Sequence, residues 1–96
     1  MACVIYCLIS ESKKLCYIGQ TKYPKNRLHV HNCHYKRHVL GTFHYLTSYE
    51  VVKEPDCKFM ILRWVPTHED CYDAERKMMV YMRVQDVYHI VNRKKS

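Results

Sequence analysis

Two short apolar runs open the chain, with a polar segment between them. Cys3–Ser10 and Leu15–Gly19 are rich in β-branched and aromatic residues, whereas Glu11–Lys14 is charged and polar. Runs of this length and composition predict two β-strands, and the short polar connection between them predicts a β-hairpin.

The predicted hairpin places two tyrosines on one face of the sheet. With Glu11–Lys14 as the loop, Tyr6 lies opposite Gly19, and Tyr6 and Tyr17 point the same way because side chains alternate along a strand. A loop one residue longer or shorter would separate them. We expect Gly19 to leave an open space across from Tyr6, so that the two phenols form the floor of a pocket. Tyrosine also packs across strands without any function, and that alternative stays open.

Helical patterning begins after the hairpin. Pro24 suits the first turn of a helix that runs toward Leu40 and stops at Gly41. Thr42–Lys53 is a second, weaker helical segment. Cys57–Val65 alternates in the manner of a third strand.

The last third of the chain predicts one more helix. Thr67 with Asp70 three residues later forms an approximate capping box. The apolar side of the helix that follows contains Cys71, Ala74, Met78, Tyr81 and Met82. Val87–Asn92 is a short apolar segment before a basic tail. This order of elements predicts one α+β domain over residues 1–96, with a small three-stranded sheet and helices packed on it.

The net charge of the chain then indicates which class of partner it binds. Sixteen Lys and Arg against nine Asp and Glu give a net charge of +7, and 48% of the residues are hydrophobic. A folded domain of this charge favours polyanionic partners, above all nucleic acid. A soluble protein that is merely basic is the alternative.

The cysteines and the apolar segments predict an intracellular protein, in the cytoplasm or the nucleus. Cys3–Ile9 is too short to cross a membrane and lacks the leading basic region of a signal peptide. The six cysteines form no C-x-x-C pair, so we expect free thiols packed as small hydrophobic groups. A disulfide scaffold is the less favoured alternative.

A stripe of Arg and His runs along one face of the predicted first helix. Arg27 and His31 are neighbours on a helix surface, and His34 and His38 continue the stripe. Arginine binds two phosphate oxygens at once, so this stripe can meet a phosphate above the tyrosines. The predicted DNA-binding residues are Arg27, His34, Lys36, Arg37 and His38. A solvated polar face is the alternative. A zinc site is another, with His29, His31, Cys33, His34 and His38 as ligands, although their spacing matches no zinc finger.

Glu75 is the acidic residue that we expect to be functional. Its helical neighbours are apolar and include Ala74, Met78 and Met82, and a carboxylate among such side chains is costly unless it is paired or binds a cation. A salt bridge to Arg63 or Arg76 would satisfy it. The functional alternative is a Mg²⁺ ligand, since Mg²⁺ often takes only one or two protein carboxylates.

Taken together, the motifs resemble the GIY-YIG nuclease domain over essentially the whole chain. The residues that carry the resemblance are Val4-Ile5-Tyr6, Tyr17-Ile18-Gly19, Gln20-Thr21, Pro24, Arg27 and His31-Asn32. Glu75 sits where that family places its metal-binding glutamate, and Asn92 resembles the family's C-terminal asparagine. Val4 departs from the pattern, which has glycine there, and we expect only a small adjustment in packing. His44 is the candidate for a further catalytic histidine of the family.

The resemblance implies a three-stranded antiparallel sheet and a metal-dependent phosphodiesterase. Glu75 would hold one Mg²⁺ or Mn²⁺ ion, and Tyr6 or Tyr17 would orient or deprotonate the attacking water. Arg27 would offset charge on the phosphate, and His31 would relay a proton or hold a phosphate. Gly19, His44 and Asn92 would support these groups.

The expected substrate is DNA, in repair or recombination, with a homodimer or a protein partner as a means of target choice. A non-catalytic nucleic-acid-binding module on the same fold is the main alternative. A zinc-stabilised interaction protein is a third.

Overall fold

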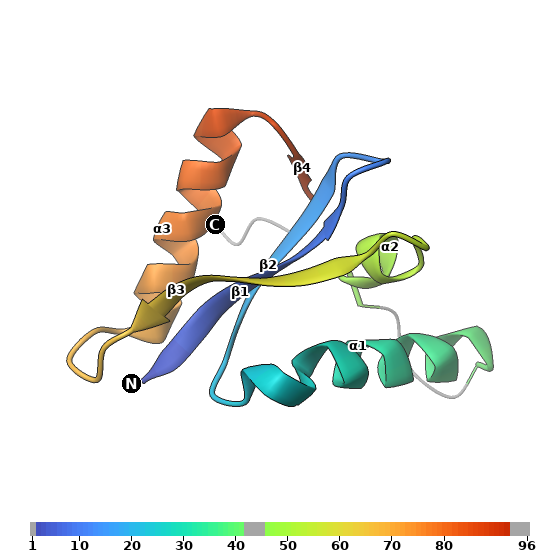
Figure 1. The fold of residues 1–96 in the computed structure, drawn as a ribbon, viewed down its shortest axis with the longest axis horizontal. Helices are drawn as coiled ribbons and strands as arrows, with labels where there is room; N and C mark the ends of the chain where they lie inside the picture. Colours follow the sequence, from blue (N-terminus) through green and yellow to red (C-terminus); the bar gives the residue numbers. More distant parts are fainter. Residues whose placement is uncertain (1, 42–45, 93–96) are drawn as a thin grey trace.

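A four-stranded sheet forms the centre of the molecule (Figure 1). The computed structural model describes residues 2–41 and 46–92. Its elements are β1 (Cys3–Ser10), β2 (Leu15–Thr21), α1 (Pro24–Val39), α2 (Tyr49–Val52), β3 (Lys58–Val65), α3 (Cys71–Gln85) and β4 (His89–Ile90). The sheet order is β3-β1-β2-β4. The α+β class is therefore confirmed, but the predicted three-stranded sheet is wrong by one strand.

The hairpin has the predicted register. β1 and β2 pair antiparallel, with Ser10 opposite Leu15 and Tyr6 opposite Gly19. β3 pairs with the other edge of β1, also antiparallel, with a register shift between Ile5 and Tyr6. A strand with neighbours on both sides is protected from solvent, and every residue of β1 is buried.

The fourth strand is short and parallel to β2. His89 donates its backbone N–H to the Lys14 carbonyl at 2.7 Å, and Val91 donates to the Cys16 carbonyl at 2.9 Å. The expected short apolar segment Val87–Asn92 contains it. Two residues are too few for an alternating pattern to indicate a strand.

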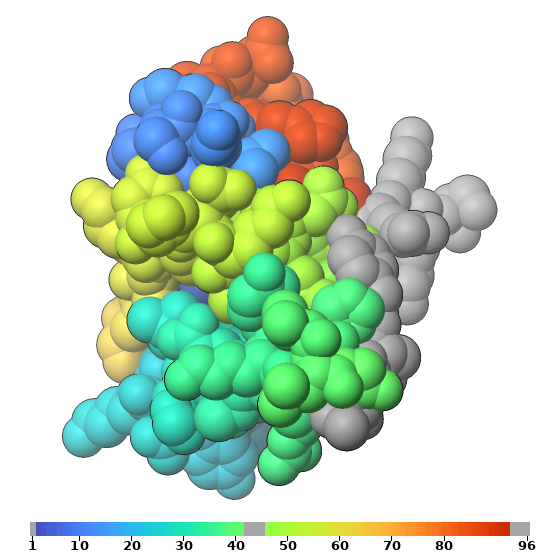
Figure 2. Space-filling view, turned by 90° about the vertical axis from the view of Figure 1, so that its right-hand side faces the viewer, coloured from blue at the N-terminus to red at the C-terminus, as the bar shows by residue number. Residues whose placement is uncertain are grey.

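Helices cover both faces of the sheet. On one face, α3 packs on Cys3, Ile5, Cys7 and other small or aliphatic side chains. On the opposite face, α1 and α2 pack on a second cluster around Tyr6 and Leu8. Figure 2 shows this side of the molecule, with α1 in cyan to green lying below the α2–β3 segment in yellow-green.

The helix boundaries match the sequence in part. α1 begins at Pro24 as predicted, and α2 covers only Tyr49–Val52 of the expected segment, of which residues 42–45 lie outside the described residues. The capping box at Thr67 is wrong. Asp70 caps α3 instead, accepting the Tyr72 backbone N–H at 2.8 Å, because residues 66–69 form a turn and Asp is favoured at this position.

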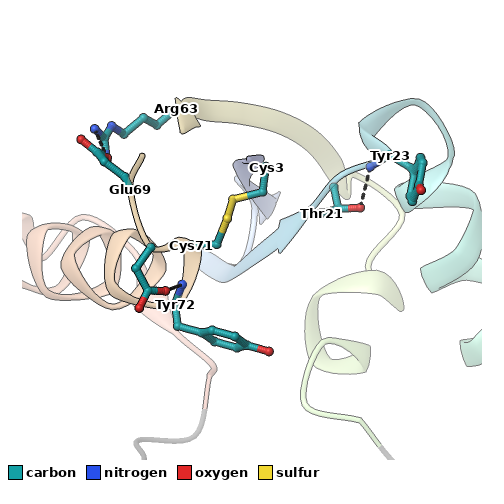
Figure 3. Close-up of a disulfide and its surroundings, with 8 residues drawn as sticks. Cys3, Thr21, Tyr23, Arg63, Glu69, Cys71 and Tyr72 are labelled. Atoms are coloured by element: carbon teal, nitrogen blue, oxygen red, sulfur yellow. Dashed lines mark hydrogen bonds and ion pairs between the residues drawn. A yellow bond between two sulfur atoms is a disulfide. The ribbon is translucent and has the colours of Figure 1, made fainter. Parts of the chain in front are cut away.

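One expectation about the cysteines is also wrong. Cys3 and Cys71 form a disulfide between the first residues of β1 and α3 (Figure 3). They are 68 positions apart in the sequence, so only the tertiary fold brings them together. The other four cysteines are free thiols, as expected. Across residues 2–41 and 46–92, no helix is long and apolar enough to span a membrane.

Candidate active site

The Tyr6 hydroxyl is the centre of a buried hydrogen-bonded group. It lies 2.8 Å from His31 Nε2, and Arg27 donates Nε–H to it at 3.2 Å. The Tyr6 side chain is fully buried, and Phe59 of β3 stacks on its ring with centroids 4.9 Å apart. Phe59 is a supporting residue that sequence reasoning missed, because only the β1–β3 pairing brings it to Tyr6.

The Tyr6 oxygen accepts one of these hydrogen bonds, because Arg27 Nε–H can only donate. In the bond to His31, the Tyr6 hydroxyl donates when the imidazole proton is on Nδ1 and accepts when it is on Nε2. Burial raises the pKa of Tyr6 above its ordinary value, while the hydrogen bond and charge of Arg27 act in the opposite direction.

His31 is neutral in this setting. Its side chain is 3% exposed, and burial followed by the nearby Arg27 charge lowers its pKa to about 4. Its Nδ1 is buried and has no hydrogen-bond partner among the described residues. An unpartnered buried polar atom lowers stability. Packing alone therefore does not explain why a histidine is buried at position 31.

Gly19 does not leave an open space, which corrects the predicted pocket floor. The Tyr6 ring fills the position across the strand, and a Cβ on residue 19 would come within 2.5 Å of Tyr6 Cζ. Glycine is therefore needed here for the close approach of the ring rather than for its backbone angles.

Tyr17 lies on the same face as Tyr6, as predicted, but in different surroundings. Its ring meets His31 edge-on, with centroids 5.6 Å apart. It is only half-buried, and its hydroxyl makes no hydrogen bond to the described part of the chain. Burial, then the charges of Tyr6 and Glu75, raise its pKa to about 12. Of the two phenols, Tyr17 is thus the one that solvent reaches.

Glu75 contributes negative charge to this group from α3. Its charge acts on both phenols and raises the pKa of each. Arg63, one of the expected ion-pair partners of Glu75, pairs instead with Glu69 at 2.6 Å. Within the described ranges, no three His, Cys, Asp or Glu side chains are grouped as a metal site. A single carboxylate can be enough to hold Mg²⁺ or Mn²⁺, which keep most of their waters, whereas a zinc site needs three or four protein ligands.

A comparison with known protein families identifies the family of the chain. The model of the GIY-YIG catalytic domain matches residues 2–80 of the 96-residue chain. The chain belongs to the GIY-YIG family. Members of this family are generally nucleases, and the chain has a nuclease-type fold. No curated protein and no solved structure matched.

Asn92 of this GIY-YIG domain makes hydrogen bonds to the backbone of the Tyr17-Ile18-Gly19 motif. Its side chain accepts the Ile18 backbone N–H at 2.8 Å and donates to the Ile18 carbonyl at 2.7 Å. Ile18 lies between Tyr17 and Gly19, so Asn92 continues the pairing of β4 along the edge of β2. That Asn92 supports the site rather than reacts stays a prediction.

The structure of this GIY-YIG domain also places Val4 and the stripe of Arg and His on α1. Val4 is fully buried within β1, where the sheet accommodates it. Along α1 the stripe turns inward: His31 is buried, and His38 lies against Tyr49 with ring centroids 5.0 Å apart. His34 and His38 are half-buried, whereas Lys36 and Arg37 are exposed. His44 lies outside the described residues.

Proposed function

We propose that this chain is a divalent-metal-dependent endonuclease that hydrolyses phosphodiester bonds in DNA. The observation that carries the proposal is the hydrogen-bonded group Arg27–Tyr6–His31, with Tyr17 beside it and within the field of Glu75. A cation for phosphate, a partly buried phenol and a carboxylate for a metal ion together match the requirements of phosphoryl chemistry.

Arg27 is the phosphate-binding group. Its Nε is fixed by Tyr6, which orients the guanidinium plane and leaves the terminal nitrogens for phosphate oxygens. A positive charge held in this way is oriented before the substrate arrives, so it stabilises charge that develops on the phosphate. Tyr6 and His31 are positioning residues in this scheme, because the Tyr6 hydroxyl is already occupied by both partners.

Tyr17 is the residue that orients the attacking water. Its side chain is only partly buried, whereas that of Tyr6 is fully buried. A pKa of about 12 makes Tyr17 a poor base by itself. A Mg²⁺ or Mn²⁺ ion held by Glu75 would polarise the phosphate and lower the pKa of nearby water and phenol groups.

The test is a nicking assay on supercoiled, linear and branched DNA, with and without Mg²⁺ or Mn²⁺. We expect metal-dependent cleavage, lowered about 100-fold or more in Glu75→Ala and Arg27→Ala, with DNA binding retained by Glu75→Ala. Asp73→Asn is the matched control, because Asp73 is an acidic residue on the same helix that pairs with Lys77 at 3.0 Å on the surface.

Two further variants separate the tyrosines. Tyr17→Phe should lower cleavage with little change in stability, because its hydroxyl has no protein partner in the described ranges. Tyr6→Phe should lower both, because it leaves Arg27 and His31 without a shared partner. Wild-type protein that binds DNA but cleaves none of the substrates in either metal would overturn the proposal in favour of the non-catalytic binding module.

A further inference from the structure

Two tyrosine side chains at helix starts are largely exposed. Tyr23 is 75% exposed and Tyr72 is 73% exposed, the two most exposed aromatic side chains among the described residues. Neither side chain makes a hydrogen bond or a ring contact with the described part of the chain. Both backbone N–H groups are used, by Thr21 and Asp70, so the backbone is anchored while the ring is free.

Each tyrosine lies about one helical turn before a charged residue of the site. Tyr23 is the N-cap residue of α1, four positions before Arg27. Tyr72 is in the first turn of α3, three positions before Glu75, and so about 60° from it around the helix. Figure 3 shows both rings extending from the starts of their helices, Tyr23 beside the end of β2 and Tyr72 directed away from α3.

Exposed cations accompany both rings, and near Tyr72 they are mixed with carboxylates. Lys22 and Lys25 flank Tyr23 in the sequence and are exposed. The exposed Arg76 is one turn after Tyr72, which also has Asp70 and Asp73 beside it in the sequence. Surfaces that bind single-stranded nucleic acid combine two components. Basic side chains follow the phosphate backbone, and exposed aromatic rings stack on the bases.

We propose that Tyr23 and Tyr72 are base-stacking residues on either side of the active site, and that the substrate is DNA with unstacked bases next to the cleaved phosphate. This inference rests on the proposed endonuclease function, of which it names the substrate class. In an uninterrupted duplex both faces of each base are covered by its neighbours, so a tyrosine ring finds no face to stack on. A flap, gap or branch exposes such faces.

The test measures stacking without cleavage. In EDTA, the protein is added to three DNAs of one sequence: an uninterrupted duplex, a duplex with a single-stranded flap, and the single strand. Each carries 2-aminopurine, whose fluorescence falls on stacking, at the first flap position. We expect quenching and tighter binding with the flap. Tyr23→Ala and Tyr72→Ala should each weaken flap binding by about 5- to 150-fold and reduce the quenching, with duplex binding changed less than about twofold.

Two controls match these variants. Tyr23→Phe and Tyr72→Phe keep the ring and should retain the quenching. Tyr81→Ala removes a tyrosine that is 58% exposed on the same helix, about 120° around it from Glu75, and should change neither signal.

The outcomes separate this inference from the proposed function. Quenching that is retained while no metal-dependent cleavage occurs would sink the endonuclease and keep the stacking residues. Cleavage with equal binding of flap and duplex, or an equal effect of Tyr81→Ala, would overturn the stacking residues and keep the endonuclease.

Discussion

The two faces of the central sheet hold different kinds of interior. Under α3 the buried side chains are small or aliphatic, such as Cys3, Ile5 and Ile18. Under α1 and α2, aliphatic side chains such as Leu8 and Val51 surround Tyr6, whose hydroxyl bonds to a buried histidine and an arginine. One strand, β1, supplies both faces through alternate residues.

This difference assigns different tasks to the two faces. An interior of aliphatic side chains gains stability in proportion to the apolar area that it buries. A buried polar group gains little, and His31 even leaves its Nδ1 without a partner among the described residues. We infer that the α3 face supplies most of the stability and that the α1 face holds groups kept for chemistry. Changes to the two faces should therefore affect different measurements.

The largest expected effect on stability is on the α3 face. Ile5 is fully buried there, so Ile5→Ala should lower the free energy of unfolding by about 2–5 kcal/mol. The measurement is urea unfolding followed by circular dichroism. Val84→Ala removes an aliphatic side chain from α3 that is 74% exposed, and should change it by less than about 0.5 kcal/mol. Cleavage by folded Ile5→Ala should stay within a few-fold of wild type. A loss as large as that of Arg27→Ala would contradict the division between faces.

Lowering the pH should reduce the free energy of unfolding through His31, on the α1 face. The pKa of His31 falls from 6.5 in the unfolded chain to about 4 in the fold, chiefly through burial. Its contribution is therefore fully present above pH 6.5 and is lost as the pH falls toward 4, because the unfolded chain takes up the proton first. The loss is at most about 3 kcal/mol.

Unfolding free energies at pH 7 and pH 4.5 measure this effect. His31→Asn cannot titrate, so the difference between the two pH values should shrink in that variant. The surface histidine variant His68→Asn serves as the control and should keep the full difference. An unchanged pH dependence in His31→Asn would show that other groups cause it.

A smaller effect on stability is expected where Gly19, in the second tyrosine motif, contacts Tyr6 in the first. Gly19→Ala places a methyl group against the Tyr6 ring, so the ring must move, at a cost of about 1–3 kcal/mol. A double-mutant cycle with Tyr6→Leu isolates the cause, because the alanine should cost much less when the ring is absent. Costs that simply add would place the strain elsewhere.

The hairpin shows what could be predicted from sequence. The register of β1 and β2 followed from a loop between adjacent strands, and it correctly placed Tyr6 opposite Gly19 and on the face of Tyr17. Spacing along one helix likewise placed Arg27 and His31 together. These are local relations, set by strand and helix periods.

Other features depend on distant parts of the chain. The Cys3–Cys71 disulfide, the Phe59 stack and the two-residue β4 join segments whose proximity no local pattern indicates. Burial also reversed one expectation, since an Arg and His stripe expected to face phosphate directs His31 into the interior. Periodicity indicates which residues share a face, and packing decides which face turns inward.

The smallest effect should arise at the edge of β2, where Asn92 makes two hydrogen bonds to the Ile18 backbone. Asn92→Ala should lower the free energy of unfolding by about 1–2 kcal/mol, because both backbone groups lose a partner. Asn92→Asp keeps the acceptor but not the donor and should fall between wild type and alanine. Asn26→Ala, at an exposed position in α1, is the control. Because Ile18 lies next to Tyr17, cleavage should fall with the loss of these bonds. Full activity in Asn92→Ala would show that the β2 edge positions Tyr17 without Asn92.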